Sequence, residues 1–282
     1  MKAVGVVGLG LIGGSMARAV KKAGCQVYGA DIDRSVLLKA QLLEIVDQEL
    51  TDANMQECTV IILGIYPRAT VEWLEKQGQY IHRDTIVMDT CGVKRAVCEP
   101  AWAIAERYGF TFVGGHPMEG AAKIGFDHSD SGMFRKASMI LCPKDDITLE
   151  KMKQLKDVLD SAGFGHYEMT TPEHHDEMIA LTSQLAHVVS SAFVMAPNCL
   201  NHRGYSAGSL RDMTRVAYLN ETMWSELFME NGDYLLPELD GLIRHLQDYR
   251  EALDNRDETA LKAMLAHGRE IKERMDSEGD RP

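Results

Sequence analysis

The chain has 282 residues, of which 45% are hydrophobic and 26% are charged, and its formal net charge is −12. This composition is typical of a globular protein, and at about 100–200 residues per domain the length predicts two domains. The acidic balance argues against nucleic acid as a partner, because phosphates attract a basic surface. The sequence has no run of about 20 apolar residues, so we expect no membrane span.

The cysteines indicate a reducing, cytoplasmic environment. None of the six lies in CxxC spacing or beside clustered histidines, as zinc sites require. We therefore expect free thiols and no metal site. Glycines interrupt the apolar N-terminal stretch, which argues against a signal peptide. The six cysteines are Cys25, Cys58, Cys91, Cys98, Cys142 and Cys199.

Short apolar runs alternate with helical patterns over the first 168 residues. Runs rich in Val and Ile predict buried strands, and the stretches between them predict helices, among them 11–23 and a helix at 95–109 that Pro100 interrupts. This alternation predicts a doubly wound, mostly parallel sheet. The expected strands are 2–8, 26–31, 59–64, 85–89, 110–115 and 138–142.

The pattern changes near residue 170. Thr171 can cap a helix and Pro172 suits its first turn, while Glu173 follows Thr170 at capping-box spacing. Strand patterns are absent beyond this point. We expect four or five helices, the first a long apolar helix that is buried, in a dimer interface, and the last spanning 257–277. The predicted domains are 1–169 and 170–282.

Gly8, Gly10 and Gly13 form a GxGxxG motif between the first predicted strand and helix, and the second strand ends at Asp31. Together these features match the dinucleotide fingerprint of a Rossmann-type α/β fold, here followed by an all-helical C-terminal domain. We expect Gly8 to make a tight turn, Gly10 to admit the pyrophosphate and Gly13 to let the helix pack closely. Asp31 would bind the ribose hydroxyls, which favours NAD over NADP, although Arg34 could serve a 2′-phosphate. The alternative is a glycine-rich turn that binds nothing.

The stretch GGHPMEG, residues 114–120, follows the fifth predicted strand. Ligands of doubly wound sheets bind at the carboxyl ends of the strands, so His116 is well placed for proton transfer near neutral pH. Pro117 stiffens the chain, and the glycines are expected to let a cofactor or substrate approach closely. The alternative is a turn histidine that hydrogen-bonds a backbone carbonyl.

Polar residues of the helical part have competing interpretations. Arg215 could bind a ligand, or it could form a helix pair with Asp212. His175 and Asp176 are adjacent, so they are predicted to point in different directions and to bind no metal. His187 stands in an apolar stretch, which is more typical of a core histidine than of a ligand-binding one.

Taken together, these motifs resemble those of prephenate and arogenate dehydrogenases. They are GLGLIGGS, DTCGVK, GGHPMEG, HHDEMIALTSQLAH, and RDMTRVA followed by MW, and the resemblance covers about residues 1–275. It implies NAD-dependent oxidative decarboxylation of prephenate to 4-hydroxyphenylpyruvate in tyrosine biosynthesis. It also implies a cytoplasmic homodimer joined through the helical domain, and the dehydrogenase core alone, without a fused mutase or regulatory domain.

The resemblance further implies roles for single residues. His116 takes the proton of the substrate's ring hydroxyl, and Arg215 binds a substrate carboxylate. His187 and Trp224 line the substrate pocket. Gly92 stands where many members have a serine that supports the histidine, and it is expected beside the substrate. The remaining expected cofactor contacts are Leu11, Ile12, Tyr66, Pro67 and Cys91.

Other departures leave the substrate open. Ala121 and Ala122 stand where Thr and Glu are common. An acidic pocket group would favour the amine of arogenate, and the sequence indicates none, so prephenate is favoured with arogenate as the alternative. Dehydrogenases of 3-hydroxyacids or 6-phosphogluconate are disfavoured, because their GxxxKxxN motif is absent after residue 150. An imine reductase is a weaker option. A non-catalytic NAD-sensing protein, from a different class, would need neither His116 nor Arg215.

Overall fold

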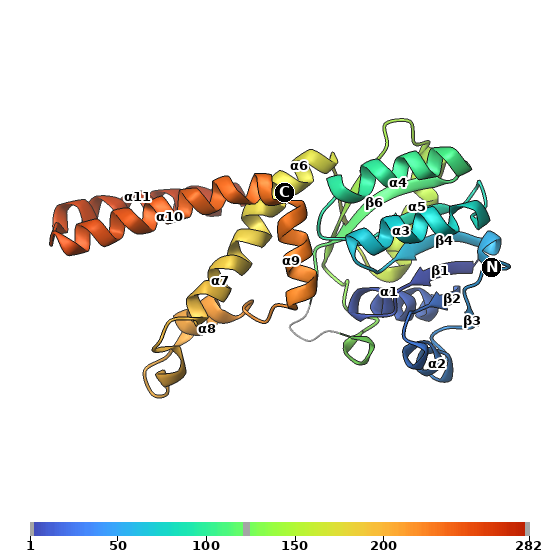
Figure 1. Ribbon diagram of the computed structural model, residues 1–282, viewed down its shortest axis with the longest axis horizontal. Helices are drawn as coiled ribbons and strands as arrows, with labels where there is room; N and C mark the ends of the chain where they lie inside the picture. Colours follow the sequence, from blue (N-terminus) through green and yellow to red (C-terminus); the bar gives the residue numbers. More distant parts are fainter. Residues whose placement is uncertain (1–2, 121–124, 280–282) are drawn as a thin grey trace. The chain divides into compact units, whose positions relative to one another are not determined.

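The structure is a computed structural model that describes residues 3–120 and 125–279, so Ala121 and Ala122 lie outside the described residues (Figure 1). An eight-stranded sheet forms its N-terminal part, in the order β3-β2-β1-β4-β5-β6-β7-β8. The strands are β1 Ala3–Val7, β2 Gln26–Ala30, β3 Gln48–Glu49, β4 Cys58–Leu63, β5 Ile86–Asp89, β6 Thr111–Pro117, β7 Ser138–Pro143 and β8 His166–Met169.

The sheet is mostly parallel, as predicted. Strands β1 to β6 pair in parallel, β7 runs antiparallel to β6 with His116 opposite Ile140, and β8 runs parallel to β7. The order changes direction beside β1, which lies between β2 and β4. Ligands of such sheets bind at this switch point. The six predicted strands are confirmed, but β3 and β8 were not expected.

Helices cover both faces of the sheet, because successive strand side chains point to opposite sides. Val4 and Val6 belong to one core, which is completed by α1, α2 and α5. Ala3 and Val7 belong to the other, which is completed by α3 and α4. These helices are α1 Leu11–Lys22, α2 Arg34–Leu42, α3 Pro67–Gln77, α4 Arg95–Tyr108 and α5 Leu149–Ala162.

The expected interruption at Pro100 was wrong, because α4 continues through it from Arg95 to Tyr108. A proline inside a helix forfeits one backbone donor. The buried side chains of Val97 and Ile104, on either side of it, hold α4 against the sheet. Burial therefore outweighs the local preference against proline. The helix ends at Gly109, whose φ of 88° suits a left-handed C-terminal cap.

After β8 the chain is helical, as predicted. Thr171 caps α6, and its Oγ1 accepts a hydrogen bond of 3.3 Å from the backbone N–H of His174. The Thr170–Glu173 capping box was therefore wrong, since the cap lies one residue later. α6, a π-helical segment and α7 form one continuous run, which with α8 to α11 makes five helical runs in the described chain. They are α6 Pro172–Ile179, the π segment Ala180–Leu185, α7 Ala186–Val194, α8 Gly208–Thr214, α9 Glu221–Glu230, α10 Gly232–Asp254 and α11 Glu258–Gly279.

The first helical run is partly buried within one chain, and its burial in a dimer interface stays a prediction. Phe193, Val194 and Met195 at its end are 39%, 37% and 76% exposed. Such exposed apolar side chains at one helix end are typical of an interface. Short 3₁₀ turns complete the connections at Met55–Glu57, Gly78–Tyr80, Phe126–His128 and Cys199–Asn201.

By contacts, the chain forms one compact unit up to Gly232 and a second from Asp233 onward. The first unit includes the sheet and helices α1 to α9. The second consists of two long helices joined by a turn, α10 Gly232–Asp254 and α11 Glu258–Gly279. The change from strands to helices follows β8, and we keep 169/170 as a proposed boundary between a nucleotide domain and a helical domain.

Candidate active site

The three motif glycines meet different surroundings. Gly8 has a φ of 81°, and a Cβ on it would lie 2.5 Å from the Gly64 carbonyl oxygen. A Cβ on Gly13 would lie 1.9 Å from the Gly8 carbonyl oxygen, so α1 can pack against this turn only if Gly13 is a glycine. A Cβ on Gly10 would meet nothing within 4 Å. Open space thus lies over Gly10, where a pyrophosphate would approach the backbone.

The N-terminus of α1 fits an anionic ligand. Gly10 is its N-cap and supplies no side-chain hydrogen bond, and Leu11 and Ile12 form the first turn. The free N–H groups and the positive end of the helix dipole both favour a phosphate at this point. The residues present therefore fit a dinucleotide.

Asp31 follows β2 and braces the glycine loop. Its carboxylate accepts hydrogen bonds from the backbone N–H groups of Leu9, at 2.6 Å, and Asp33, at 2.8 Å. Arg34 donates to Glu49 at 2.5 Å in an exposed ion pair. The arginine that could serve a 2′-phosphate thus already has an acidic partner.

Two more predicted cofactor positions lie on loops that follow parallel strands. Tyr66 is 41% exposed and is the N-cap of α3, with Pro67 in its first turn. Cys91 follows β5 and is buried, with its Sγ 3.6 Å from Thr70 Oγ1. Burial raises the pKa of the Cys91 thiol, so the group stays protonated and unreactive at neutral pH.

His116 lies near the carboxyl end of β6 and is partly buried. Its Nε2 lies 3.9 Å from the point that a Cβ on Gly92 would occupy. The glycines before it serve packing rather than ligand approach, which corrects the expectation. A Cβ on Gly114 would lie 2.4 Å from Cys98 Sγ, and one on Gly115 would lie 2.6 Å from the Asp89 carbonyl oxygen.

A buried ion pair that the sequence analysis missed lies against this strand. Lys94 and Asp89 are both 0% exposed, and the Lys94 ammonium pairs with the Asp89 carboxylate. Lys94 Nζ also donates to the Gly115 carbonyl oxygen at 2.6 Å, while Asp89 accepts from the Gly115 N–H at 3.0 Å. Gly115, the residue before His116, is therefore held by hydrogen bonds at both its N–H and its carbonyl oxygen.

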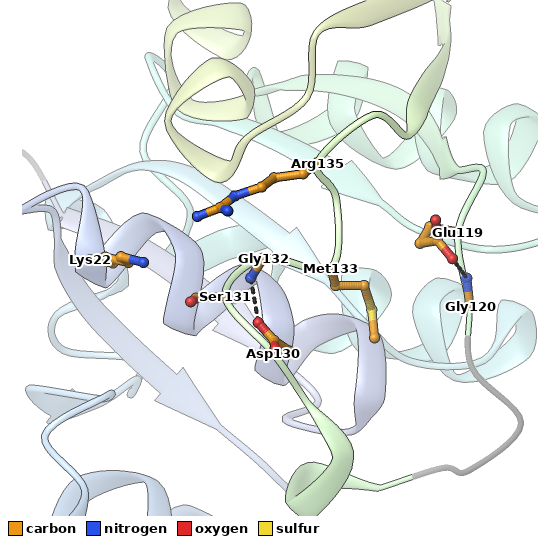
Figure 2. Close-up of a pocket in the computed structure, with 8 residues that line it drawn as sticks. All are labelled: Lys22, Glu119, Gly120, Asp130, Ser131, Gly132, Met133 and Arg135. Atoms are coloured by element: carbon orange, nitrogen blue, oxygen red, sulfur yellow. Dashed lines mark hydrogen bonds between the residues drawn. The ribbon is translucent and has the colours of Figure 1, made fainter.

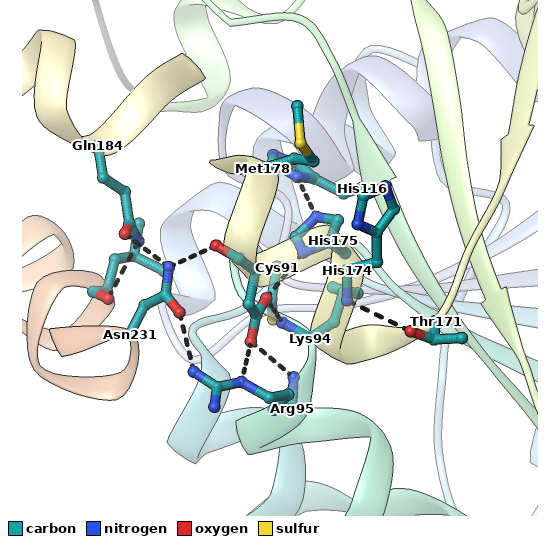
Figure 3. Close-up of polar contacts among 12 residues, drawn as sticks. Cys91, Lys94, Arg95, His116, Thr171, His174, His175, Met178, Gln184 and Asn231 are labelled. Carbon is teal, nitrogen blue, oxygen red and sulfur yellow. Dashed lines mark hydrogen bonds and ion pairs between the residues drawn. The ribbon is translucent and has the colours of Figure 1, made fainter. Parts of the chain in front are cut away.

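A second histidine contacts His116 (Figure 3). His116 Nδ1 lies 2.9 Å from His175 Nε2, and His175 Nδ1 lies 2.7 Å from Asp176 Oδ1. The prediction that His175 and Asp176 point apart was wrong. Both side chains turn toward groups of the sheet domain, since the Asp176 carboxylate accepts from the backbone N–H groups of Lys94, at 2.7 Å, and Arg95, at 3.0 Å.

These surroundings set the charges of the site. Burial lowers the pKa of His116 well below its usual range, and the neighbouring His175 and Lys94 lower it further. Burial also lowers the pKa of His175. Burial alone would raise the pKa of Asp176, but the hydrogen bonds from His175 and the Arg95 backbone lower it. At neutral pH both rings are therefore neutral and Asp176 is ionised.

A second group contains the predicted substrate residues. The rings of His187 and Trp224 lie 4.0 Å apart between centroids, tilted by 31°. His187 is half-buried, and its Nδ1 lies 2.8 Å from the Ser183 carbonyl oxygen. Burial lowers the pKa of His187, and the positive charge of Arg215 lowers it further. The structure thus brings His187, Trp224 and Arg215 into one neighbourhood.

Arg215 is exposed, and within the described residues no ion pair or hydrogen bond engages its guanidinium. Asp212 instead lies 3.7 Å from Arg211, so the Asp212–Arg215 pair is not formed. Helix α9 links the two groups, because it carries Trp224 and also Leu227, whose Cδ1 lies 3.4 Å from the point that a Cβ on Gly92 would occupy. His116 and the Arg215 neighbourhood are therefore connected through one helix.

A separate surface pocket of about 550 Å³ contains none of the predicted site residues (Figure 2). Its charged side chains are of both signs, so it presents no consistent charge to a ligand. It is lined by Lys22, Glu119, Gly120, Asp130, Ser131, Gly132, Met133 and Arg135.

All six cysteines are free thiols, as predicted. No group of three or more potential metal ligands occurs in the described part of the chain. Among the described residues, no helix has the length and apolar character needed to cross a bilayer.

Comparison with known families matches this arrangement to two consecutive domains. Residues 16–167 match the nucleotide-binding domain of prephenate dehydrogenase, which is more than half of the chain. Residues 171–267 match its dimerization domain. The chain belongs to the prephenate dehydrogenase family. It is therefore a member of an oxidoreductase family, and the residues that match the nucleotide-binding domain include His116 and begin just after the Gly8 motif.

Individual members of the family are similar over most of their length. The prephenate dehydrogenase of Bacillus subtilis is 29% identical over 89% of this chain and 70% of its own. A solved structure of prephenate dehydrogenase from Aquifex aeolicus, in complex with hydroxyphenyl propionate and NAD+, is 27% identical with a TM-score of 0.83, over 98% of both chains. The arogenate dehydrogenase of Synechocystis is 27% identical with a TM-score of 0.79, over 97% of this chain and 99% of its own.

Proposed function

We propose that this chain catalyses the NAD-dependent oxidative decarboxylation of prephenate to 4-hydroxyphenylpyruvate and CO₂. The observation that carries the proposal is the position and charge state of His116. It is a neutral histidine near the carboxyl end of β6, at the ligand-binding edge of a dinucleotide-type sheet. Family membership supports the same activity.

The dinucleotide would be held by the residues of the glycine loop and the loops after β4 and β5. Asp31 offers a carboxylate to the ribose, and Arg34 is paired with Glu49, which favours NAD over NADP. When bound, NAD supplies a hydride acceptor. The proposed cofactor residues are Gly8, Gly10, Leu11, Ile12, Gly13, Asp31, Tyr66, Pro67 and Cys91.

The substrate would meet the second group of residues. Prephenate carries two carboxylates, and an arginine can bind one of them through two parallel N–H donors. Arg215 has such donors free within the described residues. His187 and Trp224 provide a wall beside it, and Gly92 places no side chain next to His116 Nε2.

His116 would act as the general base. Its neutral ring can take the proton of the substrate hydroxyl, which turns that carbon into a carbonyl as its hydride leaves. Loss of CO₂ then makes the ring aromatic, which drives the reaction forward. Burial and the Lys94 charge keep the base unprotonated at neutral pH, so it is ready to react.

The test is NADH formation with NAD and either prephenate or arogenate, in parallel. Turnover of prephenate supports the proposal. Turnover of arogenate alone keeps the mechanism but changes the substrate. If neither reacts although NADH binds, the chain is an NAD-binding protein without this activity and the proposal fails.

We expect His116→Asn to lower kcat by about 10²–10⁴-fold, because general base catalysis contributes about that much. NAD binding, measured by fluorescence titration, should survive, since the glycine loop is untouched. His128→Asn is the matched control, because His128 is exposed and has no proposed role. Wild-type turnover in His116→Asn would remove His116 from the mechanism.

A further inference from the structure

His175 is a buried histidine to which neither the sequence motifs nor the proposed chemistry gives a role. It is 2% exposed and lies on α6, 59 residues from His116 along the chain. The two ring centroids are 5.1 Å apart and the planes are tilted by 60°. This arrangement is no stack. It brings the His116 Nδ1 and His175 Nε2 edges to hydrogen-bond distance.

The direction of each hydrogen bond follows from Asp176. Its ionised carboxylate only accepts, and it already receives N–H groups from Lys94 and Arg95. His175 Nδ1 must therefore carry the proton that is shared with Asp176 Oδ1 at 2.7 Å. A neutral imidazole carries one N–H, so His175 Nε2 is an acceptor.

Only one tautomer of His116 is then compatible with its hydrogen bond to His175. Its Nδ1–H donates to His175 Nε2 at 2.9 Å, which leaves a lone pair on Nε2. That Nε2 faces the Gly92 side of the site, 3.9 Å from where a Cβ on Gly92 would lie. The basic nitrogen of His116 therefore points to the place proposed for the substrate.

We propose that His175, held by Asp176, is a positioning residue that fixes His116 in its Nδ1–H tautomer and directs the basic Nε2 toward the substrate. This inference rests on the proposed function. In the reaction, the substrate hydroxyl proton passes to His116 Nε2, while the Nδ1 proton stays in its hydrogen bond to His175. No proton passes to Asp176, whose negative charge stabilises the His116 cation.

The charged groups around the two rings are consistent with this assignment. Lys94, at the start of α4, and His175 face His116, and both lower its pKa. Lys94 from α4, Asp176 from α6 and Asp89 from β5 face His175. The two carboxylates raise the pKa of His175 while Lys94 and burial lower it, and the balance leaves the ring neutral.

Two substitutions of His175 distinguish a hydrogen-bond acceptor from a side chain that only fills space. His175→Leu fills similar space but cannot accept from His116 Nδ1–H. In His175→Gln the amide oxygen can take that place. We expect the Leu variant to lower kcat about 10²-fold, as a misplaced catalytic group does, with NAD affinity retained. The Gln variant should recover to within about tenfold of wild type.

The direct readout is the ring ¹⁵N spectrum of His116 at neutral pH, which distinguishes Nδ1–H from Nε2–H. We expect Nδ1–H in the wild type and in His175→Gln, and a large Nε2–H population in His175→Leu. His174→Gln is the matched control. His174 is the preceding residue, its side chain is 62% exposed, and it contacts Glu177 instead. This variant should leave both turnover and the spectrum unchanged.

Each result decides the inference. An Nε2–H tautomer of His116 in the wild type overturns it, even if the Leu variant does not fold. So does an unchanged kcat and spectrum in a folded Leu variant. The proposed function fails separately, if His116→Asn keeps full turnover whatever happens at His175.

Discussion

Arg215 illustrates how a single residue on the surface can be recognised as a candidate for ligand binding. It is exposed and close enough to lower the pKa of half-buried His187, and within the described chain no carboxylate neutralises it. An arginine without an acidic partner, next to an aromatic wall, is available for an anion. Arg211, four residues earlier, lies 3.7 Å from Asp212 and therefore has an acidic partner.

We expect Arg215→Ala to raise KM for prephenate about 10- to 100-fold. A hydrogen bond to a charged group contributes about 1.5–3 kcal/mol, and each 1.36 kcal/mol is a factor of ten. The change should appear in initial-rate kinetics, with NAD saturation unaltered. Arg211→Ala is the control and should keep the wild-type KM. An unaltered KM in Arg215→Ala would place the substrate carboxylate elsewhere.

The buried histidines predict how stability depends on pH. Burial lowers the pKa values of His116, His175 and His187 in the folded chain. The unfolded chain therefore binds more protons below about pH 6.5, and the free energy of unfolding falls as the pH drops from there toward the folded pKa values. Asp176, whose pKa is lowered, adds a further loss once its carboxylate protonates in the folded state.

Thermal unfolding in buffers at pH 7 and at about pH 5.5 measures this effect. The wild type should unfold at a lower temperature at the acidic pH. His175→Gln removes one of the titrating rings, so its melting temperature should fall less between the two buffers. Equal falls in the two proteins would contradict the linkage of His175 to stability.

At the scale of one element, the turn between β1 and α1 separates two uses of glycine. Gly13 is required by packing, because a Cβ there would overlap the Gly8 carbonyl. Gly10 has open space above it and a φ of −68°, which any residue can adopt. No packing contact within the described chain requires a glycine at this position.

We therefore expect opposite defects from two similar substitutions. Gly13→Ala should destabilise the fold, with a clear drop in melting temperature, because backbone must move to relieve the clash. Gly10→Ala should melt like wild type but bind NAD at least tenfold more weakly, since a methyl would stand in the phosphate path. Calorimetry and NADH fluorescence measure the two effects. Full NAD affinity in Gly10→Ala would place the pyrophosphate elsewhere.

Elements with strong local patterns were predictable from the sequence. The Val- and Ile-rich strands and the glycine turn were found because their burial needs apolar runs and their turn needs glycine. β3 has two residues and β8 is the exposed edge segment HYEM, so neither has an apolar run. Pro100 was misjudged because tertiary burial of α4 outweighs its local effect.

Site residues were predictable where they stand in a local sequence motif, as His116 and Gly10 do. It was not predictable where contacts join distant segments. Asp176 meets Lys94 across 82 residues, and His175 meets His116 across 59. The rule that adjacent helix side chains diverge describes their Cβ directions. It does not prevent the His175 ring nitrogen nearest the backbone from reaching the next carboxylate.

At the scale of the whole molecule, the helical part leaves apolar side chains uncovered. Leu181 is 49% exposed and Met195 is 76% exposed. Both lie within residues 171–267, which match the dimerization domain. We propose that two copies of the chain cover these side chains in a twofold dimer, the commonest symmetric assembly.

Light scattering after gel filtration should give twice the 31.4 kDa of one chain. Met195→Asp should weaken the dimer at least tenfold, because a carboxylate would lose water in an apolar interface. Leu149→Asp is the control, since Leu149 is 85% exposed on α5, outside the dimerization domain. A monomeric wild type at micromolar concentration would refute the dimer.

The carboxylate of Asp176 has a consequence for how the protein can be divided. Helix α4 has no capping side chain at its own N-cap, and Asp176 accepts from its first N–H groups instead. A fragment that stopped at residue 169 would lose this cap, which is worth about 0.5–2 kcal/mol. It would also lose the histidine beside His116. Modules exchanged between relatives at this boundary would therefore need a matching carboxylate and histidine from the incoming half.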